Sequence, residues 1–168
     1  MYRYSKLWTL GLLLVIIVAP LWAQTRGELP GKKPSGEVLL PNGWRIHPVG
    51  EQLEIDVGAL GMALSPDGMR LAVLHCGVPK HSVMLIDAPN RRILHQLPIA
   101  KGWVGICWSN DGRRVYVSGG SDDVVRVFRA GVARLIEDGN VSVKPEGETS
   151  TQFVAQVAVS PDDRALYA

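Results

Sequence analysis

Apolar and polar or small residues alternate in three separate stretches of the chain, and a tight turn follows each stretch. Leu60, Met62 and Leu64 form the first run, and similar runs lead up to Ser109 and Ser160. Small residues occupy the alternate positions: Gly61, Ala63, Gly105, Cys107 and Ala158. Alternation with a period of two is typical of a β-strand that has distinct faces. The pattern predicts strands as the elements of this protein.

The turns that follow these runs are copies of one another, and each begins with a serine. The copies read Ser65-Pro66-Asp67-Gly68, Ser109-Asn110-Asp111-Gly112 and Ser160-Pro161-Asp162-Asp163. Their serines are about 44 and then about 51 residues apart, in the range of four-stranded propeller blades. Gly and Asp both tolerate the left-handed conformation that the fourth turn position requires. The repeat predicts an all-β fold, a partial β-propeller.

The spacing divides the repeat region, residues 53–168, into blades. We expect a first four-stranded blade over about 59–100, a second over about 103–151 and the start of a third near 153. Asp138-Gly139 predicts an additional hairpin turn in the long final segment of the second blade. The alternating Leu53 to Val57 predicts a lone strand that latches the ring onto a later blade. Two blades and a hairpin are too few for a closed propeller, so we expect the chain to be the N-terminal part of a longer product.

The N-terminal residues have the layout of a secretory signal peptide. Arg3 and Lys6 precede an apolar run from Leu7 to Val18, and Ala23 ends a segment of small and apolar residues. This layout predicts a signal peptide over 1–23 and export to the periplasm or the medium; the alternative is an uncleaved membrane anchor. Residues 24–52 are rich in Gly, Pro and Lys and predict a flexible leader.

The charge balance argues against a nucleic-acid partner. The formal net charge is +2, and the predicted signal peptide carries two basic residues, Arg3 and Lys6, and no acidic one. The remaining chain is therefore neutral. It lacks the clustered basic face of a nucleic-acid binder.

The first repeat resembles the YVTN-type β-propeller family. Ser65-Pro66-Asp67-Gly68 with Leu71-Ala72-Val73 carries the likeness, together with Val83 to Asp87. Asp87, Asn90, Arg92 and Ile93 stand at the spacing of that family's third turn. Tyr116-Val117-Ser118-Gly119 is similar to the tetrapeptide that names the family. The resemblance implies a propeller and covers residues 38–168.

Two further likenesses extend this one. Leu39-Leu40-Pro41-Asn42-Gly43-Trp44, ahead of Gly58 to Ser65, resembles the start of exported proteins in which such a propeller precedes a phosphoesterase domain of the alkaline-phosphatase superfamily. The second blade departs from the YVTN pattern, with Phe128-Arg129-Ala130-Gly131 at its third turn. Ser118 to Phe128 is similar to a WD40 blade, although the Gly-His and Trp-Asp signatures are absent.

Two predicted loops hold the candidate binding residues. The loop from His75 to Ser82 offers His75, Lys80 and His81 as binding candidates, and His75, Cys76 and His81 together suggest a metal site. No Cys-x-x-Cys or paired histidine with zinc spacing accompanies them, so we expect no metal and no cofactor. Asp122 and Asp123 are adjacent acids that cap a strand or bind a cation.

The tryptophans and cysteines of the repeat region are explained by packing. Trp108 stands where Leu64 and Val159 stand, so it is expected to fill the space between blades, and Trp103 to line one end of the ring. Cys107 aligns with small buried positions, which predicts two reduced thiols, although export also permits a Cys76–Cys107 disulfide.

Two function hypotheses remain open. The first is an exported module that acts in binding or scaffolding, with its other blades as partners and catalysis outside this segment. The second is an enzyme built on the propeller, such as a lactonase-like hydrolase. Propeller enzymes gather ligands from several blades around the channel, and no catalytic constellation occurs in this segment.

Overall fold

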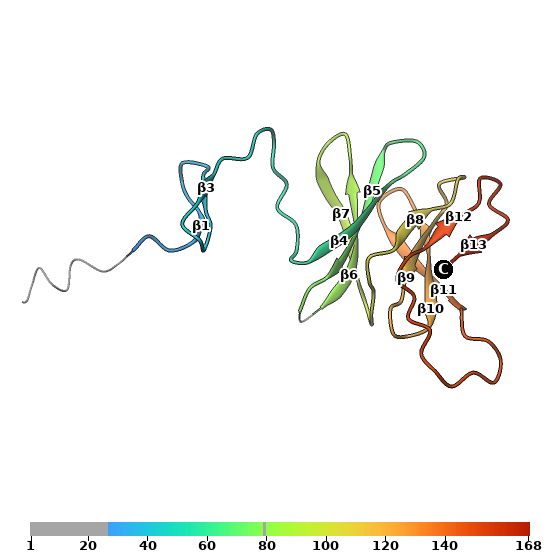
Figure 1. Cartoon of the computed structure of the whole chain (residues 1–168). Helices are drawn as coiled ribbons and strands as arrows, with labels where there is room; N and C mark the ends of the chain where they lie inside the picture. Colours follow the sequence, from blue (N-terminus) through green and yellow to red (C-terminus); the bar gives the residue numbers. More distant parts are fainter. Residues whose placement is uncertain (1–26, 79) are drawn as a thin grey trace, which may run out of the picture. The chain divides into compact units, whose positions relative to one another are not determined.

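The computed structural model describes residues 27–78 and 80–168, and the predicted signal peptide therefore lies outside the described residues. The chain divides between Gln52 and Leu53 into two compact units. Strands make up the regular structure of the described residues (Figure 1). In the same residues, no helix is long and apolar enough to cross a membrane.

The first unit holds a small antiparallel sheet, β1-β2-β3, where we expected a flexible leader. Its strands are β1 (Gly31–Lys32), β2 (Val38–Leu39) and β3 (Arg45–Ile46). Ion pairs reinforce it, because Arg45 contacts both Glu28 and Glu37. Two tight turns, with Gly36 and Gly43 at positive φ, connect the three strands. The sequence shows no apolar alternation in this segment, so these strands were not predicted.

The second unit contains the two predicted blades. Blade 1 is the four-stranded sheet of β4 (Ala59–Leu64), β5 (Arg70–Cys76), β6 (His81–Asp87) and β7 (Arg92–Ile99). Blade 2 is the sheet of β8 (Ile106–Trp108), β9 (Arg114–Ser118), β10 (Val124–Ala130) and β11 (Leu135–Ser142). Both are antiparallel, with sequential strands adjacent. The all-β fold agrees with the expectation from the repeat.

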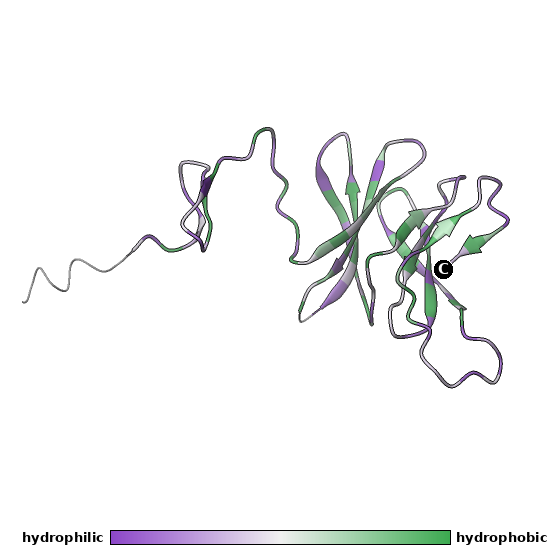
Figure 2. Cartoon of the chain, viewed as in Figure 1, coloured by the Kyte–Doolittle hydropathy of each residue, from purple (hydrophilic) through white to green (hydrophobic). Residues whose placement is uncertain are grey.

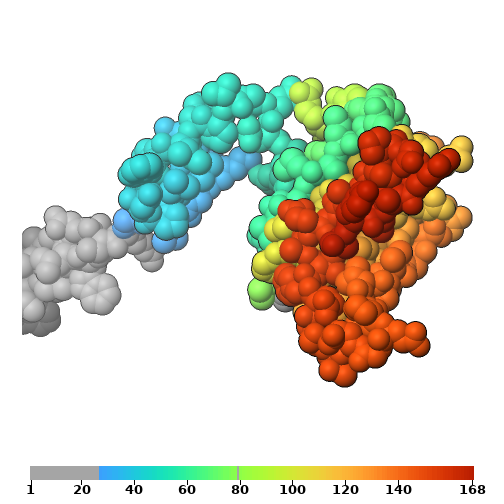
Figure 3. Space-filling model, turned by 45° about the vertical axis from the view of Figure 1, so that its right-hand side comes forward, coloured from blue at the N-terminus to red at the C-terminus, as the bar shows by residue number. Residues whose placement is uncertain are grey.

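The third repeat contributes one hairpin, β12 (Ala158–Val159) and β13 (Leu166–Tyr167). Val157 and Leu166 lie in an apolar cluster with Val125 and Tyr116 of blade 2. Figure 3 shows this last segment in red beside the orange residues of blade 2. Blade 2 is therefore covered on both faces.

The main core lies between the two blades. Ala72, Leu74 and Leu85 of blade 1 meet Val117 and Phe128 of blade 2, and all five are buried. Figure 2 shows hydrophobic residues in green along the strands of both sheets. Trp108 fills the space between the blades, as predicted: it is 7% exposed and its indole Nε1 donates to the Ala63 carbonyl at 2.9 Å.

The three repeated turns share one hydrogen-bond pattern. In each, the serine hydroxyl donates to the aspartate two residues on, at 2.5, 2.6 and 2.6 Å. The same hydroxyl accepts from the backbone N–H five residues on, at 2.9 Å in every copy. The fourth position has positive φ throughout, in Gly68, Gly112 and Asp163, which confirms the turn prediction.

Side chains also connect neighbouring turns. Asp163 of the third turn accepts from the backbone N–H of Asn110 at 2.8 Å and from Asp111 N–H at 3.2 Å. Asn110 Nδ2 donates to the Ser160 carbonyl at 2.8 Å. Asn110 stands where the other two turns have proline, and Asp163 stands where they have glycine. These two exceptional residues therefore contact each other.

Two expectations differ from the structure, and a third is not tested by it. No additional hairpin forms at Asp138-Gly139; β11 continues through it, with a bulge opposite Val127 and Gly139 at φ 99°. Residues 53–57 pair with no described strand, and because they were expected to pair with a later blade, the latch strand stays a prediction. The predicted loop from His75 to Ser82 is shorter, because β5 continues to Cys76 and β6 begins at His81 through the pairs His75 with Ser82 and Cys76 with His81.

Candidate functional site

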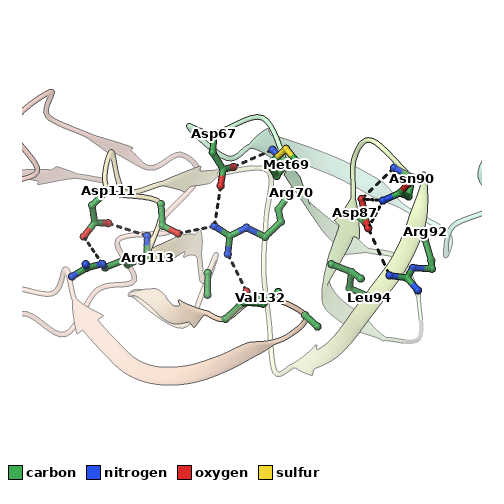
Figure 4. Close-up of a pocket in the computed structure, with 14 residues that line it drawn as sticks. Asp67, Met69, Arg70, Asp87, Asn90, Arg92, Leu94, Asp111, Arg113 and Val132 are labelled. Atoms are coloured by element: carbon green, nitrogen blue, oxygen red, sulfur yellow. Dashed lines mark hydrogen bonds and ion pairs between the residues drawn. The ribbon is translucent and has the colours of Figure 1, made fainter.

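A groove of about 600 Å³ lies between the two blades, on the side where the repeated turns lie. Four connections bound it: the β4–β5 and β6–β7 turns of blade 1 and the β8–β9 and β10–β11 turns of blade 2. Three aspartates and three arginines line it (Figure 4). These are Asp67, Asp87, Asp111, Arg70, Arg92 and Arg113.

The three carboxylates are fixed by hydrogen bonds within their own turns. Asp67 accepts from the Ser65 hydroxyl at 2.5 Å and the Met69 N–H at 3.0 Å, and Asp111 accepts from Ser109 and Arg113 in the same way. These bonds, the serine bond foremost, lower the pKa of both carboxyls. The carboxylates therefore stay ionised. In both, these hydrogen bonds end on Oδ1, whereas Oδ2 lies 3.7 Å from Arg70 in Asp67 and 4.0 Å from Arg113 in Asp111.

Asp87 is held by a different turn with the same result. It accepts from the backbone N–H of Asn90 at 3.1 Å, and from Asn90 Nδ2 at 3.0 and 2.9 Å. The Asn90 side chain is the main cause of the lowered pKa of Asp87. The Asp87 and Asn90 positions singled out by the family resemblance thus form a side-chain-stabilised turn.

Arg70 is the fixed arginine of the groove. Its guanidinium donates to the carbonyls of Gly131 at 2.9 Å and Gly112 at 3.2 Å, and its Cζ lies 4.9 Å from the centre of the Trp108 ring. Both carbonyls belong to blade 2, so Arg70 connects the blades and orders the groove wall. A planar, permanently charged guanidinium suits this combination of stacking and forked hydrogen bonding.

Arg92 and Arg113 are held much more loosely. Arg92 lies 3.7 Å from Asp87, and Arg113 lies 4.0 Å from Asp111. Their side chains are 71% and 84% exposed. Both guanidinium groups are free to reorient toward a ligand in the groove.

The predicted loop residues lie away from this groove, and His75 is not in a loop at all. It belongs to β5 and is fully buried, and neither ring nitrogen has a hydrogen-bond partner. Burial lowers the pKa of His75, and nearby Asp56 partly opposes the shift. His75 is therefore inaccessible as a metal ligand in this arrangement.

His81 and Cys76 position the connection into blade 2. His81 Nδ1 accepts from the Gly102 N–H at 2.8 Å, and Cys76 Sγ donates to the Trp103 carbonyl at 2.9 Å. The Trp103 ring meets Phe153 edge-on, with centroids 5.3 Å apart. Lys80 lies beside His81 and Asp56 in a second cavity of about 310 Å³.

Asp122 and Asp123 are both engaged in holding loops. Asp122 pairs with Arg126 and, at 3.0 Å, with Lys101. Asp123 pairs with Lys144 at 3.2 Å and accepts from the Gln152 N–H at 2.8 Å. Within residues 27–78 and 80–168, no group of three or more His, Cys, Asp or Glu side chains could hold a metal ion.

Both cysteines are free thiols. Burial raises the pKa of Cys76, and it raises that of Cys107 to about 11. Thiols with raised pKa values carry little thiolate at neutral pH and are poor nucleophiles.

Sequence reasoning missed the groove, although it described its parts. The repeat placed Asp67 and Asp111 at equivalent turn positions, and such turns lie on one side of adjacent blades. It gave no sign that the turn carrying Arg92 approaches the Gly131 connection of blade 2. That proximity is visible only in the packed pair of blades.

Comparison with known proteins supports the fold alone. No family model matches the sequence, and no curated protein matches it. Among solved structures, hydrazine synthase of Kuenenia stuttgartiensis is 21% identical with a TM-score of 0.55, over 71% of this chain and 31% of that one. A protein from Lactobacillus plantarum is 15% identical with a TM-score of 0.56, over 82% and 42%.

A third similar structure is the periplasmic gluconolactonase PpgL of Pseudomonas aeruginosa, 21% identical with a TM-score of 0.51 over 77% of this chain and 41% of that one. The chain thus spans less than half the length of each of these structures. At such identities the likeness concerns architecture. With its antiparallel four-stranded sheets, the molecule is a partial β-propeller.

Proposed function

We propose that this chain is a binding module of an exported propeller protein and that the groove between blades 1 and 2 is its binding site. The observation that carries the proposal is the groove itself, at about 600 Å³ within the usual range for ligand sites. Its wall is ordered by Arg70, whereas Arg92 and Arg113 are exposed and loosely paired. A wall that Arg70 holds in place, beside the exposed side chains of Arg92 and Arg113, is suited to binding a ligand.

The cellular setting belongs to the same proposal. The signal-peptide layout of residues 1–23 supports export, and the YVTN-like repeat with Leu39 to Trp44 supports a propeller that precedes a phosphoesterase domain. Mass spectrometry of the periplasmic or secreted protein is expected to find Gln24 at the N-terminus. Sequencing of the gene's downstream part is expected to find a metal-binding set of Asp, His and Ser or Thr.

The second candidate is a lactonase-like hydrolase. It is favoured by the likeness to a structure named as a gluconolactonase, with a TM-score of 0.51. The groove chemistry argues for binding, because its carboxylates are committed to turn hydrogen bonds and have lowered pKa values, which makes them weak general bases.

A hydrolysis assay separates the two functions. The purified chain is incubated with a panel of sugar lactones, with and without added divalent cations, and acid release is followed in a pH-stat. Binding alone predicts rates equal to the uncatalysed background. Hydrolysis above background that is lost in a heat-denatured sample would favour the enzyme.

A further inference from the structure

We propose that two histidines of blade 1 form a pH-sensitive attachment to blade 2, which acidification releases so that the wall of the groove loosens. They are His81, at the start of β6, and His95, within β7. The inference concerns how the two blades are held together. It therefore goes beyond the proposed binding function and stands whether or not the groove binds a ligand.

Both histidines accept a backbone hydrogen bond across the boundary between the blades. His81 Nδ1 accepts from the Gly102 N–H at 2.8 Å, in the connection that leads into blade 2. His95 Nδ1 accepts from the Leu135 N–H at 3.2 Å, at the start of β11. A ring nitrogen can accept a hydrogen bond only while it carries no proton. Both attachments therefore require the neutral imidazole.

Their placement distinguishes these two histidines from the others. The chain contains four histidines. Of the other two, His47 lies in the first unit and His75 is buried without a hydrogen-bond partner. No histidine follows position 95, and the next boundary, between blade 2 and the third repeat, is joined in part by the backbone pair Gly120 and Val154. Among the described residues, histidine acceptors thus occur at the first boundary and not at the second.

Protonation would turn each acceptor into a donor. An imidazolium carries N–H groups on both ring nitrogens, so the Nδ1–H of His95 would face the N–H of Leu135. Leu135 is 2% exposed, and a buried N–H that loses its acceptor destabilises the folded chain more than one that water can reach. Histidine side chains generally change charge between about pH 8 and pH 5, so a fall in pH favours breaking both hydrogen bonds.

Charged groups of both signs surround each histidine. The charged and titratable residues on the elements around His81 are Asp56, Lys80, Lys101 and Cys76. Those around His95 are Asp87, Arg92, Arg134 and Glu137. Lys101 pairs with Asp122 at 3.0 Å, and burial raises the pKa of Cys76, which keeps its thiol neutral. Positive and negative groups offset each other in both sets, so the hydrogen bond is the feature that favours the neutral imidazole.

Release at His95 would reach the groove directly. Residues 131–133 of the β10–β11 connection line the groove, and Leu135 follows two residues later. The Gly131 carbonyl in this connection also accepts from Arg70 at 2.9 Å. Without the hydrogen bond at Leu135, fewer bonds hold the connection against blade 1. We therefore expect this wall of the groove to be more mobile at acidic pH.

The test is hydrogen–deuterium exchange of the full chain, followed by mass spectrometry at pH 7.5 and pH 5.5. Protection factors are corrected for the pH dependence of intrinsic exchange and compared for segments 99–105, 131–137 and 152–156. The variants are His81→Asn and His95→Asn, because the amide oxygen of asparagine can accept near the position of Nδ1 and does not titrate. His47→Asn, at an exposed position in the first unit, is the matched control.

In the parent chain, protection of segments 99–105 and 131–137 is expected to fall about tenfold between the two pH values, as for the loss of one hydrogen bond that leaves a buried donor unpaired. Segment 152–156, at the boundary without histidine, is expected to lose less. His81→Asn should keep the protection of 99–105 at pH 5.5, and His95→Asn should keep that of 131–137. Each variant thus tests its own segment, and His47→Asn should behave like the parent.

Three results would overturn the inference. The first is equal protection of both segments at the two pH values in the parent chain. The second is a fall in the two asparagine variants as large as that in the parent. The third is an equal fall in all three segments that neither variant changes, which would show a global loss of stability on acidification. Since no ligand is added, none of these results bears on whether the groove binds one.

Discussion

At the scale of single residues, two buried polar side chains have opposite environments. Arg126 is 6% exposed, but its Nε donates to the Lys101 carbonyl at 2.8 Å and its guanidinium pairs with Asp122. His75 is fully buried and has no hydrogen-bond partner for either ring nitrogen. The sequence placed His75 in a loop because polar residues end the apolar run. Pairing with Ala59 and Ser82 keeps it in the sheet.

The buried imidazole predicts a pH-dependent stability. Burial lowers the pKa of His75 in the folded chain below the ordinary value of 6.5, so the unfolded chain takes up the proton first as pH falls. The free energy of unfolding is therefore expected to decrease from pH 7.5 to pH 5.5. The decrease should be smaller in His75→Leu, as measured by urea denaturation at both pH values.

The control for this prediction is His47→Leu, an exposed position in the other unit. It should leave the difference between the two pH values unchanged. An equal pH dependence in the parent chain and His75→Leu would show that other groups cause the loss.

At the scale of elements, packing around the first strand of each blade, β4 and β8, explains why small residues recur in the repeat. A Cβ on Gly61 would lie 2.4 Å from the Val104 carbonyl oxygen, and one on Gly105 would lie 2.7 Å from Gln156 Cα. Each glycine thus allows the backbone of the next blade to approach closely. The small face, with Ala63, packs toward blade 2.

This close approach predicts a large effect of a single methyl group. Gly61→Ala and Gly105→Ala should each destabilise the chain by about 2 kcal/mol or more, because backbone atoms would have to move apart. Thermal melting followed by circular dichroism measures the loss. Gly27→Ala is the control, since a Cβ there meets nothing within 4 Å. Equal melting of all three variants would contradict the prediction.

Turns and strands could be predicted from the sequence where residues close together in the chain determine them. The serine turns follow from Ser65-Pro66-Asp67-Gly68 and its copies, because their hydrogen bonds join residues no more than five apart. The bulge at Gly139 and the unpaired Leu53 to Val57 depend on partner strands elsewhere, so short-range patterns could not reveal them.

At the scale of the whole molecule, the two blades differ in how their equivalent faces are covered. Leu60, Met62 and Leu64 of β4 are 50%, 65% and 56% exposed. Trp108, which holds the position of Leu64 in blade 2, is 7% exposed because blade 1 covers it. Val73, Met84 and Ile86 on the same face are buried, so the exposed part is the β4 edge. Propeller blades normally bury both faces against neighbours, so these exposed β4 side chains form a surface prone to association.

We therefore predict that residues 24–168 alone do not stay monomeric at micromolar concentrations. Size-exclusion chromatography with light scattering should show larger species, and Met62→Lys with Leu64→Lys should shift them toward the monomer. Val132→Lys, an exposed apolar position away from β4, is the control. A monodisperse monomer of the parent chain would contradict the prediction.

The candidate site was the least predictable feature at this scale. Its aspartates could be assigned to turns from the sequence, and so could their hydrogen bonds. The groove exists only because the turn of Asp87 and Arg92 meets the Gly131 connection of blade 2, and that proximity depends on how two sheets stack.

The contacts between consecutive turns also give the repeats a fixed order. A chain of interchangeable units would tolerate transposition of its blades, since every boundary would offer the same partners. Here the first boundary uses Arg70 on the Gly112 carbonyl, whereas the second uses Asp163 on Asn110. Each boundary between blades thus has its own side-chain hydrogen bonds, and blades joined in another order would not meet the same partners. The blades have similar sheets, and a few side chains at their turns distinguish one from another.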